Sequence, residues 1–435
     1  MALRREVLLK ARQEAASARL DALTLPAGGG WITRAREDAL TRLRAMGLPT
    51  RRDEYWKFTD PAALVAPATD SAELLGEDPD GTVFDTIDRL KIVFVDGEFD
   101  ADASDDLAAE GLEITRLAEA ARHDLHWARD AYGLLEAEGQ APVERPLAAL
   151  NTAFATDGVL IRATGKVSRP VALHYLRKDG NADAMVHHCI KLEPGSEMTL
   201  LESGAAAARF SQVLEVDVGD GARFNHVRTQ GRDHERVSNS NLFARVGEGG
   251  VLKSFTLSAN GALTRNEAFI TLNGRDGVAH IAGAALGDGA FHHDDTVFIT
   301  HAAPACESRQ VYKKVLRGGA TGVFQGKILV KQPAQLTDGY QISQALLLGG
   351  DDSQFLAKPE LEIYADDVKC SHGSTTGEID PEQLFYLRSR GMPEEEASAL
   401  LVLAFVAEAI EEIENPDLAE DVRTHLAGWL DRHRG

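Results

Sequence analysis

The segment Cys370-Ser371-His372-Gly373 holds the residues of this sequence that are best suited to binding a metal. A thiolate and an imidazole two positions apart can face the same side of an extended segment, and both bind soft or borderline metals such as iron. One cysteine and one histidine cannot hold a cluster by themselves, so further ligands would come from another chain. The residue types alone leave open a second interpretation, a buried thiol beside a hydrogen-bonded histidine.

A second group of possible ligands, His292-His293-Asp294-Asp295 with His301, lies earlier in the chain. On a strand, His292 and Asp294 would share one face and His293 and Asp295 the other, so only two side chains per face can converge. The spacing matches no established zinc site. We interpret these residues as polar side chains on the wall of a β-domain.

The three cysteines, Cys189, Cys306 and Cys370, are too few and too scattered for a disulfide framework. This predicts a reducing, cytoplasmic setting. Cys306 is expected to be a small buried hydrophobe. His187-His188 next to Cys189 is a weaker metal-binding pattern than the one at Cys370 and His372.

Nucleotide and nucleic-acid binding find little support in the sequence. Residues 322–327 (Gly-Val-Phe-Gln-Gly-Lys) have one residue too few between their glycines for a P-loop, and Ile328 follows where Ser or Thr is required. No GxGxxG opens a helix. The formal net charge of −22 argues against a protein that grips phosphate backbones. We therefore expect no ATP hydrolysis by the isolated chain and no binding to nucleic acid.

The composition along the chain predicts three regions. Residues 1–145 are expected to form a mainly helical N-terminal domain, with a short strand near 92–95 and a return to helix over 104–140. Residues 146–365 carry short β-favouring runs between glycine turns, and residues 366–435 are expected to be a helical C-terminal domain. Because no helical pattern of three turns interrupts the middle region, an alternating parallel α/β sheet is excluded.

Glycine turns in the middle region recur at Gly195, Gly219, Gly247, Gly274, Gly318 and Gly349, with separations of 24, 28, 27, 44 and 31 residues. A further turn at Gly287 divides the longest interval into 13 and 31, so most intervals are about 25–31 residues. This spacing is typical of a coiled β-solenoid, in which each coil stacks only on its neighbours and the apolar side chains form a continuous internal core. A β-sandwich would show turns every 8–12 residues or so. The spacing favours the solenoid without eliminating the sandwich.

The C-terminal region carries an apolar helix face within residues 394–414. Leu400, Leu403, Ala407 and Ile410 recur at steps of three and four, so one side of the helix must be covered. Most such faces pack on their own domain, and a minority bind a partner.

The first residues (MALRREVLLKARQEAASAR) contain charged side chains that interrupt every apolar run, so we expect no signal peptide. No stretch approaches the roughly 18–20 apolar residues of a membrane span. A chain that is neither exported nor inserted in a membrane is expected.

Several segments resemble one known family. Residues 366–377 (DDVKCSHGSTTG) and 383–391 (QLFYLRSRG) are closely similar to the C-terminal signature of the SufB/SufD family, scaffold components of the SUF iron–sulfur cluster assembly machinery. Within the family, Lys-Cys-Ser-His-Gly and the upstream Glu54-Tyr55-Trp56-Lys57-Phe58-Thr59 resemble the branch that pairs with SufB. Further similarity, which extends the match over most of residues 50–410, covers residues 150–154, 157–158, 301–308, 312–313, 324–327 and 361–363.

The resemblance implies a right-handed parallel β-helix between helical N- and C-terminal domains. It also implies a non-catalytic scaffold that pairs with a SufB partner through the β-helix ends and docks the ATPase SufC through its C-terminal helices, with a homodimer possible when alone. His372 and Cys370 become candidate iron or cluster ligands near that interface, and Cys370 is the weaker candidate of the two. The isolated chain is expected to hold no tightly bound cofactor; an iron–sulfur cluster or iron would be shared transiently with SufB, and a flavin could bind only to the complex.

Two other functions remain open from the sequence. One is a β-helix enzyme acting on polysaccharide through His292, Asp294 and Asp295, although exported enzymes of this kind carry signals and aromatic platforms, and aromatic content here is only 6%. The other is a purely structural partner in which Cys370 and His372 only stabilise the fold.

Overall fold

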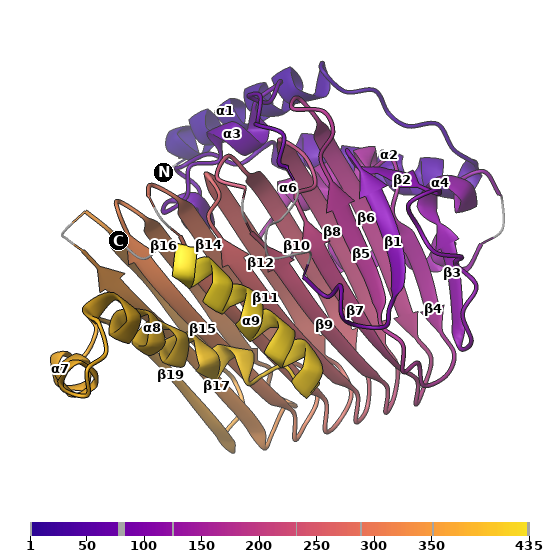
Figure 1. Ribbon diagram of the computed structural model, residues 1–435. Coiled ribbons are helices and arrows are strands. Elements are labelled where there is room, and N and C mark those ends of the chain that lie inside the picture. The colour runs from indigo at the N-terminus through magenta and orange to yellow at the C-terminus, as the bar shows by residue number, and fades with distance from the viewer. Residues whose placement is uncertain are drawn as a thin grey trace.

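The computed structural model describes residues 2–76, 83–123, 126–231, 233–287, 289–349 and 352–432 (Figure 1). Its N-terminal third contains helices and a few short strands that precede the main β-region. The helical elements there are α1 (Ala2–Leu20), α2 (Gly30–Met46), η1 (Glu54–Trp56), α3 (Ala62–Val65), α4 (Leu117–Ala120), η2 (Trp127–Asp130), α5 (Leu134–Glu138) and α6 (Pro146–Phe154). The C-terminal helices are α7 (Pro381–Ser389), α8 (Glu394–Ile410) and α9 (Pro416–Arg432).

Two sheets form the body of the described chain. Sheet A has ten strands, β1 (Leu90–Val95), β2 (Glu98–Asp100), β5 (Val171–Leu176), β7 (Glu197–Gly204), β9 (Arg223–Gln230), β11 (Val251–Ala259), β13 (Val278–Leu286), β15 (Glu307–Arg317), β17 (Thr337–Leu348) and β19 (Val368–Gly377). Sheet B has nine, β3 (Leu112–Arg116), β4 (Val159–Ala163), β6 (Asp183–Leu192), β8 (Arg209–Val218), β10 (Val237–Val246), β12 (Leu263–Leu272), β14 (His292–His301), β16 (Thr321–Val330) and β18 (Gln354–Ile363).

The chain alternates between the two sheets, and the resulting β-solenoid has about seven turns. Val237, Leu263, His292 and Thr321 occupy one register column, so the coils between them are 26, 29 and 29 residues long. From β4 onward, every pairing within a sheet is parallel among the described strands. The glycine spacing therefore predicted the fold correctly, and the sandwich alternative was wrong.

The interior of the solenoid is filled by alternate side chains of both sheets. Leu200, Val216, Phe224 and Ile281 are among the buried members of this core. Because successive strand residues point to opposite faces, each strand buries a second row of side chains only if its outer face is also covered.

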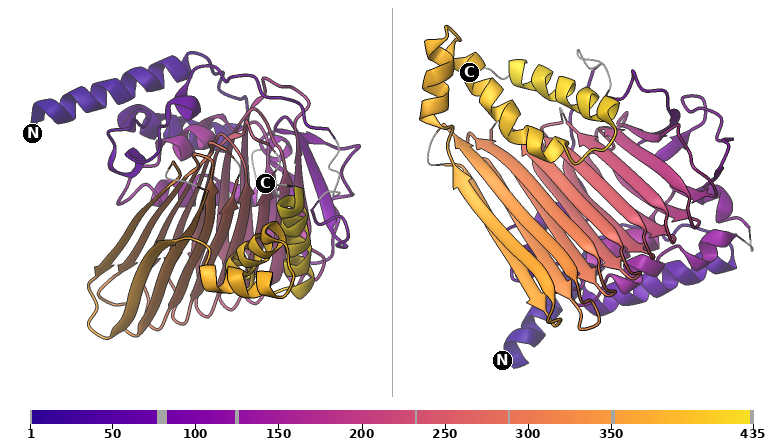
Figure 2. Two further views of the ribbon diagram at one scale, coloured as in Figure 1. Left: turned by 60° about the vertical axis from the view of Figure 1, so that its left-hand side comes forward. Right: turned by 90° about the horizontal axis from the view of Figure 1, so that it is seen from below.

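Helices cover both outer faces. The N-terminal helices pack on sheet B, where Leu135 of α5 and Ala148 of α6 lie in one cluster with Phe243. The C-terminal helices pack on sheet A, where Val406 of α8 lies in one cluster with Phe255. Figure 2 shows the two groups of helices on opposite sides of the solenoid. No helix among the described residues is long and apolar enough to cross a membrane.

Some boundaries differ from those expected. Residues 366–377, expected in the helical C-terminal domain, contain β19 and continue sheet A. Residues 104–140, expected to be helical, contain β3 and only short helices, because Leu112–Arg116 pairs antiparallel with β4. The strand expected near 92–95 is present as β1. Helix α8 ends at Ile410, before the expected end near Glu414.

The tight stacking of coils predicts a strong effect of a methyl group at Gly204. This residue has φ of +104°, and a Cβ built there would lie 2.1 Å from the carbonyl oxygen of Tyr175 on the neighbouring strand. Gly204→Ala should cost at least about 2 kcal/mol more than Gly195→Ala, in which the φ of +73° is also left-handed but no atom lies within 4 Å. Urea unfolding of both variants measures the difference, and equal losses would contradict the steric argument.

Candidate functional site

Cys370 and His372 lie on β19, the last strand of sheet A (Figure 1). Strand β19 pairs with β17 along one edge, and no described strand pairs with its other edge. In sheet B, β18 is likewise terminal. The two metal-binding candidates therefore stand at the uncovered end of the solenoid, where backbone groups are available for pairing with another chain.

Cys370 points toward the solenoid interior. It is half-buried and packs against a small apolar cluster that includes Ile328, Val330 and Ala365. Burial raises the pKa of the Cys370 thiol, which a backbone hydrogen bond from Gly339 only partly offsets. The thiol is thus the protonated, less nucleophilic form at neutral pH.

His372 shares that side of β19, since it is two residues further along the strand. Its side chain is exposed and makes no hydrogen bond or ion pair with the residues that the structure describes. Both ring nitrogens are therefore accessible to a ligand from outside the chain. Of the two candidates, His372 is the better placed to bind one.

A ladder of buried amides leads up to His372 from the preceding coils. Gln310, Gln341 and His372 occupy one register column on β15, β17 and β19. Gln341 Nε2 donates to Gln310 Oε1 at 2.7 Å, while Gln341 Oε1 is buried and lacks a hydrogen-bond partner among the described residues. Gln341 Oε1 is thus an acceptor without a donor, in the register column that ends at His372.

Space for the ladder depends on Gly326. A Cβ built at Gly326 would lie 1.8 Å from Gln341 Nε2. The lack of a side chain at Gly326 thus gives the Gln341 side chain room to cross the interior. The ladder in the last coils therefore depends on a glycine at this position. An imidazole N–H donated to Gln341 would leave the other ring nitrogen of His372 free to bind a metal, the usual arrangement of metal-binding histidines.

The end of the solenoid also exposes large apolar side chains. Leu336, Ile363 and Tyr364 are 56, 40 and 59% exposed. All three lie in or beside the last coils, near the half-buried Leu361. Exposed apolar groups beside unpaired strand edges are typical of surfaces that another chain covers.

The four docking candidates of α8 share one face of that helix but differ in their burial. Ile410 is fully buried in the cluster between α8, α9 and sheet A, and Leu403 packs partly against it. Ala407 is half-buried, and Leu400 is 44% exposed. Most of the apolar stripe thus covers sheet A, and Leu400 is the member that remains accessible.

Helix α7 carries an exposed pair that the periodicity of the sequence did not single out. None of the residues of α7 is buried, and Phe385 and Tyr386 are 74 and 56% exposed. The helix projects at the margin of the molecule, beside α8 and away from the sheets (Figures 1 and 2). A two-turn helix has no amphipathic signal in isolation, so only the arrangement of the elements reveals this surface.

The residues of β14 do not form an open site. His292 and Asp294 face outward, as the alternation predicted, but they are covered by Thr59, whose Oγ1 lies 2.9 Å from His292 Nε2 and donates to Asp294 at 2.5 Å. Asp295 faces the interior, where it forms an ion pair with Lys314. Both carboxylates are buried and neutralised, so they do not line a groove for a polysaccharide.

His301 and Cys306 also have hydrogen-bond partners within the chain. His301 lies at the other end of β14, with Nε2 2.8 Å from Ser308 Oγ, and burial lowers its pKa to about 4. Cys306 packs in the solenoid core, with Sγ 3.2 Å from the carbonyl oxygen of Gly274. Neither residue joins the other candidates, and Cys306 is the small buried hydrophobe that we expected.

Residues 54–59, the mixed charged and aromatic segment, fasten the N-terminal region to sheet B. Tyr55 donates to Glu360 at 2.7 Å, and the Trp56 ring stacks on the buried guanidinium of Arg265 at 4.0 Å. The segment thus reaches the terminal strand β18. Its role in this structure is to hold the last coils, which the sequence alone did not indicate.

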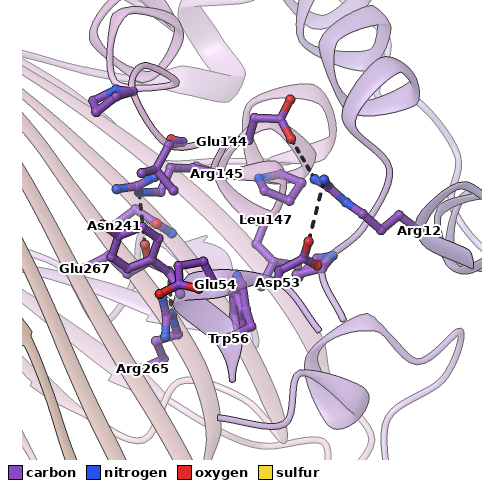
Figure 3. A pocket seen from close by; sticks show the side chains of 16 residues that line it. Arg12, Asp53, Glu54, Trp56, Glu144, Arg145, Leu147, Asn241, Arg265 and Glu267 are labelled. Atoms are coloured by element: carbon purple, nitrogen blue, oxygen red, sulfur yellow. Dashed lines mark hydrogen bonds and ion pairs between the residues drawn. The ribbon is translucent and has the colours of Figure 1, made fainter. Parts of the chain in front are cut away.

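A cavity of about 380 Å³ lies beside residues 54–59 (Figure 3). Arg12 pairs with Glu144 at 2.8 Å, and Arg145 and Arg265 contact the two oxygens of Glu267 at 3.2 and 2.6 Å. Burial lowers the pKa of Arg145 to about 9. Each of these arginines forms an ion pair with a carboxylate, so the cavity joins elements together, and its described lining offers no free cation to an anionic ligand.

Comparison with known proteins assigns most of the chain to two conserved regions. Residues 175–405 match the SUF system FeS cluster assembly, SufBD core domain, and residues 29–173 match the SufBD protein N-terminal region. The iron–sulfur cluster assembly protein SufD of Escherichia coli is 30% identical over 90% of this chain and 91% of its own length. SufD of Bacillus subtilis is 24% identical over 92 and 94% of the two chains.

His372 makes no hydrogen bond in the described structure, but it lies in the register column of Gln341, so we predict that in solution a ring N–H of His372 donates to the free Gln341 Oε1. In the Gln341→Leu variant the acceptor is lost, so the side chain of His372 should change from one predominant tautomer to a mixture. Two-bond proton–nitrogen correlation spectra of histidine-labelled protein, with His372 assigned by its alanine variant, measure this. Gln344→Leu is the matched control, because Gln344 lies on the same strand with its side chain on the outer face, bonded to Lys313 and Thr375. Unchanged His372 signals in Gln341→Leu would contradict the ladder.

Proposed function

Because the chain belongs to the SufB/SufD family of iron–sulfur cluster assembly proteins, we propose that it is a non-catalytic scaffold subunit of the SUF machinery that pairs with SufB and docks the ATPase SufC. The observation that carries this proposal is the position of His372. Its unoccupied imidazole stands on the terminal strand of the solenoid, at an end that no described element covers.

Pairing with SufB would take place at this end. Strands β18 and β19 present unpaired backbone groups, and Leu336, Ile363 and Tyr364 present apolar surface beside them. A second solenoid could continue both sheets, which would satisfy the edges and bury the apolar groups together. The same surface could hold a second copy of this chain when SufB is absent.

The nascent cluster, or its iron, is the cargo of the complex and would lie between the two subunits. His372 supplies one nitrogen ligand, and SufB supplies thiolate and carboxylate ligands, since one imidazole cannot hold a cluster. Cys370 is the less suited ligand because its thiol is half-buried and its pKa is raised by burial. It would take part only if the interface opened, which the ATP-driven motion of SufC could cause.

Docking of SufC is assigned to the C-terminal helices. Phe385 and Tyr386 on α7, with Leu400 on the neighbouring α8, form the exposed apolar surface of this region. The sequence carries no P-loop, so ATP binding belongs to the partner. We assign no resident cofactor to the isolated chain; a flavin would belong to the assembled complex. We propose that cluster assembly by this complex takes place in the reducing cytoplasm.

His372→Ala should lower the iron and sulfide content of the complex by about tenfold or more, because a ligand is removed. The complex should remain intact, since the exposed side chain makes no contact whose loss would cost more than about 0.5 kcal/mol. The measurement is anaerobic co-expression with the SufB and SufC of the same organism, purification through this chain, and analysis of iron, sulfide and subunit content.

His234→Ala is the control, because His234 is also an exposed histidine and lies in the loop between β9 and β10. Normal iron and sulfide content in the His372→Ala complex would exclude His372 as a ligand. A drop in stability or in SufB content before any drop in iron would favour the alternative that these residues only stabilise the assembly.

Phe385→Asp should weaken SufC binding at least tenfold while SufB stays bound, because a charge would replace an apolar contact at the centre of the docking surface. Leu74→Asp is the matched control, since Leu74 is 52% exposed but lies in the N-terminal region. Subunit ratios after purification and SufC titration report the effect. Equal SufC content in both variants would place the docking surface elsewhere.

A further inference from the structure

A buried group of three possible metal ligands lies under the N-terminal helices, far along the chain from β19. His187 and Cys189 are on β6, two residues apart, and both face outward from the solenoid. Glu215 on β8 is the register partner of Cys189. One nitrogen, one sulfur and one oxygen from these residues lie within 4.8 Å of one another, and all three residues are buried. The sequence showed only the histidine and the cysteine, because Glu215 is one coil away.

The carboxylate of Glu215 is held rigidly. Its Oε2 accepts from the backbone N–H of Gly133 at 2.6 Å, and its Oε1 accepts from the N–H of Glu136 at 2.8 Å. These amides belong to the start of α5, so the carboxylate joins the N-terminal region to sheet B. A ligand bound at this carboxylate would meet a group already fixed in position.

Hydrogen bonds to the Glu215 carboxylate join the three ligand atoms in the metal-free structure. His187 Nε2 lies 2.8 Å from Glu215 Oε2, and Cys189 Sγ donates to the same oxygen at 3.5 Å. Burial and the carboxylate raise the pKa of the Cys189 thiol well above its usual range. The thiol is therefore protonated whenever no cation is present.

Glu215 has hydrogen-bond partners but no lysine or arginine partner in the described structure, and His187 has one ring nitrogen without a partner. Glu215 is 2% exposed, yet no lysine or arginine of the described residues forms an ion pair with it. His187 is fully buried beneath the ring of Tyr132, at 4.2 Å, and its Nδ1 has no hydrogen-bond partner. Buried carboxylates are normally paired with a cation, so a bound dication would supply the positive charge that Glu215 lacks.

We propose that His187, Cys189 and Glu215 form a structural binding site for a divalent borderline metal, Zn²⁺ above all. A dication bound by one thiolate, one carboxylate and one neutral imidazole gives a site without net charge. The thiol proton is released on binding, and the proton between His187 Nε2 and Glu215 Oε2 moves to Nδ1 of the neutral imidazole, which frees Nε2 to bind the metal. Three protein ligands leave a fourth position for a water molecule.

The distances are close to those that zinc requires. Tetrahedral bonds of about 2.0–2.3 Å place the ligand atoms about 3.3–3.7 Å apart. The separation of Cys189 Sγ and Glu215 Oε2, 3.5 Å, already has this value. That of His187 Nε2 and Glu215 Oε2, 2.8 Å, needs a small opening once the bridging proton is gone. The metal would fasten α5 to sheet B and would take no part in cluster assembly at β19.

The test uses the full chain with Cys370→Ser, so that the half-buried thiol on β19 cannot contribute. Because the site is buried, the metal must be supplied during synthesis, in minimal medium that contains Co²⁺ or Zn²⁺. We expect one metal ion per chain by elemental analysis and, with Co²⁺, a thiolate-to-cobalt charge-transfer absorption band. X-ray absorption should show one sulfur and several nitrogen or oxygen neighbours.

Adding Cys189→Ser should abolish the charge-transfer band and lower the bound metal at least tenfold. Adding Cys306→Ser, which removes the other buried thiol, should change neither. Metal-free parent protein, or a metal content that is equal in the parent and in Cys189→Ser, would overturn the proposal and show that the three residues share protons only. If the Cys189→Ser protein does not fold, the band and the sulfur neighbour in the parent still decide the question.

Discussion

The strands of each coil form hydrogen bonds with the strands of the coils on either side. The last coil of the described chain therefore has backbone N–H and C=O groups without a partner on its outer edge, and this need for pairing determines how the end of the molecule is used. A β-strand in the middle of either sheet has both of its edges paired, whereas β18 and β19 have one. Burying unpaired N–H and C=O groups is costly, so the last coil needs either a cap or a partner. The described chain supplies no cap there. The family signature, with Cys370 and His372, lies on that last coil.

The same constraint explains how the helices are used. Two sheets wound as a coil have one shared interior and two outer faces, and each outer face that carries apolar residues must be covered. The N-terminal helices cover sheet B and the C-terminal helices α8 and α9 cover sheet A. Helix α7 covers neither sheet, and Phe385 on it is 74% exposed in the described chain. An aromatic side chain that no sheet requires is therefore available to a partner.

The sequence predicted those features that repeat along the chain or depend on neighbouring residues. Glycine spacing predicted the solenoid, and strict alternation correctly separated His292 and Asp294 from His293 and Asp295. It could not predict contacts that depend on coil length. Cys189 meets Glu215 because that coil advances by 26 residues, and Gln310 meets Gln341 because a later coil advances by 31. Coil lengths vary with their loops, and no local pattern specifies them. The stripe from Leu400 to Ile410 was recognised as apolar, but only the packing shows that Ile410 is buried.

Polar groups inside a β-solenoid must be satisfied by their own coil or by the next one. The Asp295–Lys314 pair meets this requirement within the structure, as do Glu202, His226 and Arg228, which form a buried network of ion pairs. The column of Gln310 and Gln341 does not, because Gln341 Oε1 is buried without a partner and the column ends at the exposed His372, with no further described coil beyond it. A ladder that ended on an apolar side chain would leave Gln341 Oε1 buried at a cost of about 1–3 kcal/mol. An imidazole can donate one N–H to Gln341 Oε1 and still offer its other nitrogen outward, so the interior of the solenoid and the surface for the partner meet at His372.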